Sequence, residues 1–300
     1  MKGVESRCAS GGAGPYTDSV FIDIGGFTLH CRIAGKGMPL LIFLHGSFLS
    51  VRSWRHVFDA LSEHATVVAF DRPAFGLTSK PRASEPEGIS YGPEAQADLV
   101  AELIGRLGFE KAVLAGNSTG GTLALLAALR HPGRVEGIVL ADAMIYSGYA
   151  TSGIPAFMKP AMKTMSPLFA GIMKIMISRL YNRVIRSMWY RKERLGEDLL
   201  ASFRRDLMNG DWSRAFWEVF IETHHLRLDE KLKTLDIPVL VMTGEHDVMV
   251  RKAESLRLAR ELPSANLSVF ADCGHLPQEE KPEEFIAALK EFLHKIRDGR

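Results

Sequence analysis

Cysteine is scarce in this sequence of 300 residues. Its three cysteines, Cys8, Cys31 and Cys273, include no Cys-x-x-Cys pair, and an odd number cannot pair completely. These counts argue against a disulfide framework or a zinc site and favour a reducing compartment, so the expected location is cytoplasmic. We also expect no other metal and no cofactor.

Long apolar runs and a strong charge of one sign are missing too. Lys174, Arg179 and Arg183 interrupt the longest apolar stretches, so no segment is predicted to span a bilayer. Residues 1–18 are rich in Gly, Ser and Ala and contain no apolar core of signal-peptide length, which predicts a flexible leader. Lys and Arg total 37 against 35 Asp and Glu, a net charge of +2, which argues against a nucleic-acid-binding protein.

The sequence does contain a regular alternation of short apolar runs with longer stretches of helical spacing. This alternation predicts an α/β domain with a mostly parallel sheet. The first two strands, joined by a Gly25-Gly26 turn, are expected to form an antiparallel edge. The expected strands are 19–24, 28–33, 40–44, 66–70, 112–115, 135–140, 238–242 and 266–270. The expected helices of this domain are 51–62, 92–107, 119–130, 250–261 and 282–296.

The alternation breaks over residues 145–234. This stretch has helical spacing, is rich in Met and Arg, and shows no clear strand. It predicts a helical cap, or lid, inserted between two strands. The expected organisation is therefore an α/β core made of residues 19–144 and 235–298, with the cap inserted into it.

The segment Gly116-Asn117-Ser118-Thr119-Gly120 matches Gly-x-Ser-x-Gly. It follows an apolar strand and opens an Ala- and Leu-rich helix, which is the strand–turn–helix setting of a nucleophile elbow. Glycines are needed where a sharp turn leaves no room for a Cβ atom. The alternative is a glycine-rich helix cap without catalytic function. We interpret Ser118 as the nucleophile.

A serine nucleophile requires a base, and the base requires an orienting acid. In this setting the acid and then the histidine follow the serine along the chain, at the carboxyl ends of strands. Asp247 and His275 occupy such positions and are the expected acid and base. Asp142, at the end of an earlier strand, is the alternative acid, and His246 precedes the final strand.

Two backbone N–H groups are expected to stabilise the oxyanion, one from Thr119 and one from Ser47 in the loop after the third strand. His45 in that loop is interpreted as structural. Phe48, Asn117 and Leu276 neighbour these positions and are the candidate substrate-binding residues. His224 and His225 lie in the insertion and are candidates to line a pocket there.

With these motifs in place, the chain resembles the α/β-hydrolase fold enzymes from about residue 20 to residue 296. The resemblance also includes Asp71-Arg72-Pro73-Ala74-Phe75-Gly76-Leu77-Thr78, in which Ala74 and Thr78 replace the family's usual Gly and Ser. It implies an eight-stranded, mostly parallel sheet flanked by helices, with a helical cap after the sixth strand. It also implies acyl transfer to Ser118, with His275 as general base and then acid, and Asp247 holding its ring.

Within this superfamily Ser118 argues against haloalkane dehalogenases and epoxide hydrolases, which use an aspartate nucleophile. Cofactor-free haloperoxidases generally lack so large a lid. The elbow is also similar to that of carbon–carbon hydrolases of ring-fission products, which usually have Trp where this chain has Leu276 and a Gly-rich oxyanion loop. We therefore expect a serine hydrolase that cleaves an apolar carboxylic ester. The alternatives are such a carbon–carbon hydrolase and a ligand-sensing receptor that retains the fold.

The insertion is unusually basic. No acidic residue lies between Asp142 and Glu193, whereas the same stretch holds eight basic residues and seven of the twelve methionines. Three interpretations stay open: an amphipathic helix packed on the core, methionines lining an adaptable pocket, and reversible docking on an anionic membrane surface. The expected partner is thus a small apolar ester, with weak membrane contact through the lid as a further hypothesis. The oligomeric state is left open.

Overall fold

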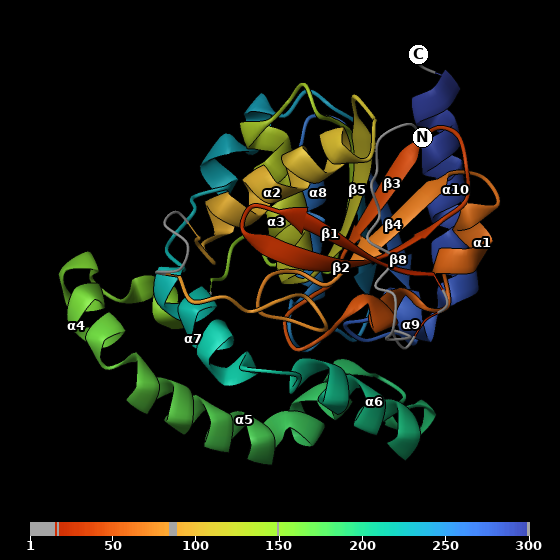
Figure 1. The fold of residues 1–300 in the computed structure, drawn as a ribbon. Coiled ribbons are helices and arrows are strands. Elements are labelled where there is room, and N and C mark those ends of the chain that lie inside the picture. The colour runs from red at the N-terminus through yellow and green to blue at the C-terminus, as the bar shows by residue number, and fades with distance from the viewer. Residues whose placement is uncertain (1–15, 17, 84–88, 149, 299–300) are drawn as a thin grey trace.

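Figure 1 shows the computed structural model, which describes residues 16, 18–83, 89–148 and 150–298. The predicted leader therefore lies almost entirely outside the described residues. Eight strands form one sheet, as the alternation of apolar runs predicts. They are β1 (Ser19–Ile24), β2 (Phe27–Ala34), β3 (Leu40–Leu44), β4 (Thr66–Phe70), β5 (Ala112–Asn117), β6 (Val135–Ala141), β7 (Val239–Gly244) and β8 (Ala265–Phe270).

The strand order is β1-β2-β4-β3-β5-β6-β7-β8. The strand β2 pairs antiparallel with both β1 and β4, and every other neighbouring pair is parallel. The predicted mostly parallel, eight-stranded α/β-hydrolase fold is confirmed. Because the parallel strands end at one edge of the sheet, the loops after β3, β5, β6, β7 and β8 meet there.

Helices cover both faces of the sheet (Figure 1). Leu99, Leu123 and Leu258 belong to one apolar cluster, so α2, α3 and α8 cover one face. Phe58 and Phe292 belong to a second cluster, so α1 and α10 cover the other. The helices of this part are α1 (Phe58–Ser62), α2 (Pro93–Arg106), α3 (Thr119–Arg130), α8 (Lys252–Glu261), α9 (Pro277–Glu280) and α10 (Pro282–Asp298).

The helical cap follows the sixth strand, as predicted. Its helices are α4 (Lys159–Thr164), α5 (Ser166–Met188), α6 (Glu197–Leu207) and α7 (Trp212–Glu222). In Figure 1, α7 lies between α5 and the sheet, and α4 and α5 form the outer rim of the molecule. None of the helices in the described part of the chain is long and apolar enough to cross a membrane.

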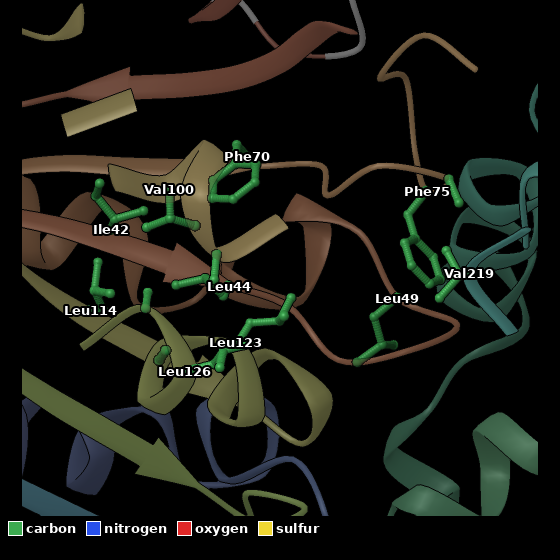
Figure 2. Close-up of a cluster of buried hydrophobic side chains, with 14 of the residues drawn as sticks. Ile42, Leu44, Leu49, Phe70, Phe75, Val100, Leu114, Leu123, Leu126 and Val219 are labelled. Carbon is green, nitrogen blue, oxygen red and sulfur yellow. The ribbon is translucent and has the colours of Figure 1, made fainter. Parts of the chain in front are cut away.

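The apolar core continues from the sheet into the cap. Figure 2 shows Leu49 and Phe75, from loops after β3 and β4, lying beside Val219 of α7. The rings of Phe75 and Phe216 also meet edge to face, with centroids 5.4 Å apart. The cap is thus packed against the loops that carry the candidate site.

One predicted helix is wrong in its extent. The expected helix 51–62 is broken into a short 3-10 helix, Val51–Trp54, and α1. The break lets Trp54 turn inward, where its buried ring stacks on Phe43 of β3 with centroids 4.4 Å apart. Burying an indole against the sheet outweighs the continuity of a short helix.

Candidate active site

Ser118 sits at a sharp turn between β5 and α3. Its backbone has φ 54° and ψ −122°, a strained conformation for a residue with a side chain. The flanking glycines permit the turn. A Cβ atom on Gly120 would lie 2.0 Å from the carbonyl oxygen of Leu44, and one on Gly116 would lie 2.3 Å from the carbonyl of Gly120. This local geometry is that of a nucleophile elbow, with the serine side chain half-buried at its tip.

His275 and Asp247, which lie in the loops after β8 and β7, are joined by a hydrogen bond. The distance from His275 Nδ1 to Asp247 Oδ2 is 2.8 Å, and both residues are buried. The other carboxylate oxygen of Asp247 accepts hydrogen bonds from the backbone N–H groups of Met249 and Val250. An ionised Asp247 therefore fixes the imidazole with its Nδ1 proton toward the carboxylate, so Nε2 faces away from it.

Asn117 links the serine turn to the histidine loop. Its side-chain amide donates hydrogen bonds to the carbonyl oxygens of His275 at 3.0 Å and Ala141 at 3.2 Å. Since Asn117 directly precedes Ser118, these bonds hold the two candidate catalytic residues together. Asn117 is fully buried and its amide nitrogen makes structural hydrogen bonds, while its contact with substrate stays a prediction.

Asp142, the alternative acid, is a second buried carboxyl group beside the pair. One ligand atom from each of Asp142, Asp247 and His275 lies within 4.8 Å of the others. Asp142 accepts hydrogen bonds from the Thr243 hydroxyl at 2.7 Å and the Gly244 N–H at 3.2 Å. These residue types can also bind a metal, but the short Asp247–His275 bond matches a hydrogen-bonded triad.

The environment of Asp142 favours its neutral form. Burial, together with the nearby charge of Asp247, holds the pKa of the Asp142 carboxyl well above its usual range, although the Thr243 hydroxyl opposes this shift. Two close carboxylates in a dry site do not both ionise readily. The neutral form of Asp142 is therefore favoured, and Asp247 is the carboxyl group that bonds the imidazole.

The expected oxyanion residues lie side by side. The hydroxyl oxygens of Ser47 and Thr119 are 3.0 Å apart, and Arg72 Nη2 donates to the Thr119 hydroxyl at 3.2 Å. A Cβ atom on Gly46 would lie 3.1 Å from the Ser118 Cβ, so the loop after β3 approaches the elbow closely. The assignment of the Ser47 and Thr119 backbone N–H groups to an oxyanion remains a prediction.

His45 holds this loop in place, in the structural role expected for it. Its Nε2 accepts from the Arg72 N–H at 3.0 Å, so its Nδ1 carries the proton that is donated to the Gly46 carbonyl at 2.8 Å. Burial, helped by the Arg72 charge, lowers the pKa of His45 to about 3. The imidazole therefore stays neutral.

The histidine loop is also fastened to the cap. The His275 N–H donates to the Met188 carbonyl at the end of α5 at 2.8 Å. The buried Glu280 carboxylate accepts from the N–H groups of Gly274 at 2.7 Å, Tyr190 at 2.9 Å and Arg191 at 3.2 Å. Sequence reasoning missed Glu280, whose only signal is its place soon after Cys273-Gly274-His275.

A cavity of about 480 Å³ lies between the cap and the core. It reaches the elbow at Thr119 and Thr122, and the predicted pocket residues His224 and His225 line its cap side. Its apolar lining residues are Leu123, Met144, Ile145, Val219, Leu226 and Leu228. Its polar lining includes Arg72, Gln96, Arg227, Asp229 and Glu230.

Two other predicted substrate-binding residues lie elsewhere. Leu276 is fully buried in the apolar core and does not line the cavity described above, so its contact with substrate stays a prediction. Phe48 is half-buried at the junction with the cap. Its ring centroid lies 5.3 Å from that of Phe216, and its carbonyl accepts from the Tyr181 hydroxyl at 2.9 Å. Its contact with substrate stays a prediction.

Comparisons with known proteins identify the family of the chain. Residues 41–288 match the model of a family described as the alpha/beta hydrolase family. The 2-hydroxy-6-oxo-2,4-heptadienoate hydrolase of Pseudomonas putida is 29% identical over 279 residues, which cover 90% of this chain and 94% of that one.

Solved structures share the fold. A thermophilic esterase from Thermogutta terrifontis superposes with a TM-score of 0.73 and 23% identity, covering 92% of this chain and 98% of that one. The meta-cleavage product hydrolase of Pseudomonas fluorescens IP01 gives a TM-score of 0.69 and 25% identity, covering 92% and 97%. The chain belongs to the alpha/beta hydrolase family. The Pseudomonas putida sequence relative is a dienoate hydrolase, whereas the esterase is a structural neighbour that shares the fold.

Proposed function

We propose that this protein is a serine hydrolase that cleaves a carboxylic ester through Ser118, His275 and Asp247. The observation that carries the proposal is the 2.8 Å bond between Asp247 and His275, in a loop that Asn117 ties to the Ser118 turn. Acid, base and nucleophile thus come from three loops at one edge of the sheet, in the order typical of the fold.

In this mechanism His275 Nε2 takes the proton of the Ser118 hydroxyl while Oγ bonds to the ester carbonyl carbon. The resulting oxyanion accepts hydrogen bonds from the backbone N–H groups of Ser47 and Thr119. The carbon–oxygen bond to the alcohol then breaks, and His275 returns the proton to the leaving oxygen. Water repeats the sequence on the acyl-enzyme, giving a carboxylic acid and free Ser118. Asp247 stabilises the imidazolium in both halves.

The cavity supports a small substrate with an apolar part. Its volume of about 480 Å³ is within the range typical of small-molecule sites. Leu123, Met144 and Val219 offer an apolar wall beside Thr119. We infer that the acyl or alkyl group of the ester lies against this wall.

A second candidate function is the hydrolysis of a carbon–carbon bond in a ring-fission product. It is favoured by the Pseudomonas putida relative, whose name gives such a dienoate as its substrate. Arg72 and Arg227 line the cavity and supply the positive charge that a carboxylate would need. The buried Leu276, in contrast, does not line this cavity.

The test compares p-nitrophenyl acetate, butyrate and octanoate with 2-hydroxy-6-oxo-2,4-heptadienoate. We expect the Ser118→Ala variant to lose at least about 10⁴-fold in kcat on every ester that the wild type cleaves. Ser202→Ala, in the cap helix α6, is the matched control and should keep full activity. Undiminished esterase activity in Ser118→Ala would refute the serine mechanism. A kcat/KM higher for the dienoate than for all esters would select the second function, and fluorophosphonate labelling without turnover would indicate a receptor.

A further inference from the structure

The apolar residues of α5 form two rows, and only one of them is covered. The covered row faces α7 and the core and consists of Met173, Ile177, Tyr181 and Ile185. The other row faces solvent: the exposed fractions of Ile172 and Ile175 are 52% and 57%. The interpretation of α5 as a helix simply packed on the core thus accounts for one row alone.

The exposed row is part of a longer apolar surface. Further exposed apolar residues occur before α4 and at the start of α5, the two helices that form the outer rim of the cap. We define this outer face of the cap by the exposed residues Phe157, Met158, Met165, Leu168, Ile172, Ile175, Met176 and Leu180. Single exposed apolar residues are ordinary, but a contiguous series on one face marks an interaction surface.

The methionines of the insertion do not explain this surface. The one methionine among the cavity's lining residues is Met144, which belongs to the core segment just before the insertion. Met158, Met165 and Met176 instead point to solvent. These three side chains belong to the outer face and not to the pocket.

Positive charge accompanies the outer face. Lys174, Arg179 and Arg183 on α5 are exposed, and they form no ion pair with any residue that the structure describes. By helical spacing Arg179 and Arg183 lie among the exposed apolar positions, whereas Lys174 lies on another side of the helix. Lys163 and Lys159 instead turn toward α7, where Lys163 pairs with Glu222 and Lys159 donates to the Thr223 carbonyl. Since no acidic residue occurs between Asp142 and Glu193, the chain itself offers no neighbouring carboxylate in sequence.

We propose that the outer face of the cap docks on an anionic lipid bilayer surface. Apolar side chains at half exposure, interleaved with unpaired cations along a helix, fit a helix lying in the plane of the headgroups. The long Lys and Arg side chains reach lipid phosphates while the apolar side chains enter the acyl boundary. A second copy of the chain is a poorer occupant, because a symmetric contact would set the cations of the two copies against each other.

This proposal does not depend on the reaction at Ser118, and its test needs no substrate. Co-sedimentation of the full-length protein is measured with vesicles of phosphatidylcholine alone and with vesicles containing 30% phosphatidylglycerol. We expect binding to the anionic vesicles and little to the neutral ones, with affinity falling as salt is raised. Each cation at an anionic surface is worth about fivefold in affinity, so Lys174→Gln/Arg179→Gln/Arg183→Gln should weaken binding on the order of 100-fold.

Matched controls separate docking from general surface effects. Ile172→Ser/Ile175→Ser should lose at least about tenfold in vesicle affinity, since each buried apolar side chain contributes to insertion. Leu267→Ser/Val269→Ser, which removes two exposed apolar residues of β8, should bind as wild type does. Lys36→Gln/Lys111→Gln/Arg297→Gln removes three exposed cations of the core and should also leave binding within about threefold. All these sites are exposed, and circular dichroism checks that each variant folds.

Three results would overturn the proposal. Wild-type protein that binds neither vesicle, or binds both equally, contradicts an anionic lipid surface. If Lys174→Gln/Arg179→Gln/Arg183→Gln binds the anionic vesicles with wild-type affinity, the cations do not contribute to binding. A concentration-dependent dimer in light scattering, abolished by Ile172→Ser/Ile175→Ser in a protein that ignores vesicles, assigns the face to a second copy.

Discussion

Asp142 and Asp247 place carboxylate oxygens within 4.8 Å of each other in a buried site, and only Asp247 bonds the ring of His275. The two candidate acids therefore differ in function although both follow a strand at the same edge of the sheet. Asp247 orients the histidine as a charged group. Asp142, kept neutral by burial and by the charge of Asp247, completes the hydrogen bonding behind it.

This division predicts opposite sensitivities to an amide. Asp142→Asn replaces a neutral carboxyl with a neutral amide that can still accept from Thr243, so we expect kcat to stay within about tenfold of wild type. Asp247→Asn removes the charge that holds the imidazole and should cost about 10⁴-fold in kcat. Steady-state kinetics on the best ester compares the two. Equal losses would contradict the assignment. Infrared spectra should also show a protonated carboxyl band that disappears in Asp142→Asn.

Glu280 is predicted to position His275 through the loop and the cap. The Glu280 carboxylate accepts hydrogen bonds from three backbone N–H groups. In Glu280→Gln an NH₂ group replaces one of the accepting oxygens and leaves at least one of these N–H groups without an acceptor. We therefore expect the free energy of unfolding to fall by about 1–3 kcal/mol. We also expect kcat to fall more than KM rises, because the histidine loses its fixed place. Urea unfolding and kinetics measure both effects. Glu284→Gln, at an exposed site of α10, is the control and should change neither.

Gly120 is predicted to tolerate no side chain. In Gly120→Ala the new Cβ atom would lie 2.0 Å from the Leu44 carbonyl oxygen. Leu44 ends a central strand, so its backbone cannot shift without disturbing the hydrogen bonds of the sheet. We expect a loss of more than about 3 kcal/mol in stability, or failure to fold. Gly105→Ala in α2 meets only the end of the Arg134 side chain at 3.8 Å. That control should gain about 0.5–1 kcal/mol, since alanine favours the helix. Thermal unfolding of both variants decides the point.

Acid is predicted to destabilise the protein through His45. The pKa of His45 in the folded protein is about 3, below the ordinary value of 6.5. Between these two pH values the unfolded chain binds a proton at His45 and the folded chain does not. Stability from this group is present above pH 6.5 and is lost as the pH falls toward 3. Between pH 6.5 and 5 the loss should be about 2 kcal/mol. Urea midpoints measured over this range test it. In His45→Gln the free energy of unfolding should depend less steeply on pH, by the equivalent of about one bound proton. An unchanged slope would contradict the assignment to His45.

A second chain of serine, histidine and aspartate shows why residue types alone do not define a site. Ser19 Oγ lies 2.9 Å from His30 Nε2, and His30 Nδ1 lies 2.8 Å from Asp71 Oδ2. The Asp71 carboxylate also accepts from the N–H groups of Val51 and Leu77, and these bonds tie loops to the sheet. Ser19 lies on an edge strand, without an elbow or a helix N-terminus behind it. Sequence order and the Gly-x-Ser-x-Gly setting pointed instead to Ser118.

The sequence predicts what depends on local pattern. The strands follow from apolar runs, and their predicted ends agree with the structure within one or two residues. The elbow at Ser118 follows from the glycines that a sharp turn requires. The acid could not be decided that way, because Asp142 and Asp247 both follow strands. Which of the two bonds His275 depends on which loop approaches the histidine, and that is a long-range property of the fold.

The packing of the cap was not predictable for the same reason. Both rows of α5 are apolar, and sequence spacing gives no sign that Ile177 meets the core whereas Ile175 meets solvent. For Asn117 and Leu276, proximity in sequence to Ser118 and His275 does not tell which way a side chain points. Both side chains are buried in the structure, and their contact with substrate stays a prediction.

The bond from the His275 N–H to the Met188 carbonyl ties the end of α5 to the loop that holds the candidate base. The end of α5 cannot lift without pulling the histidine from its acid, and a side chain at Gly274 could not fill the gap, since its Cβ would sit 2.5 Å from the same carbonyl. The cavity between the cap and the core is lined on its cap side by Val219 and by residues 223–230, and not by α4 or α5. We therefore expect a rearrangement of the Met188 joint to disturb His275 directly, whereas a change at the cavity lining would leave the hydrogen bond between His275 and Asp247 in place.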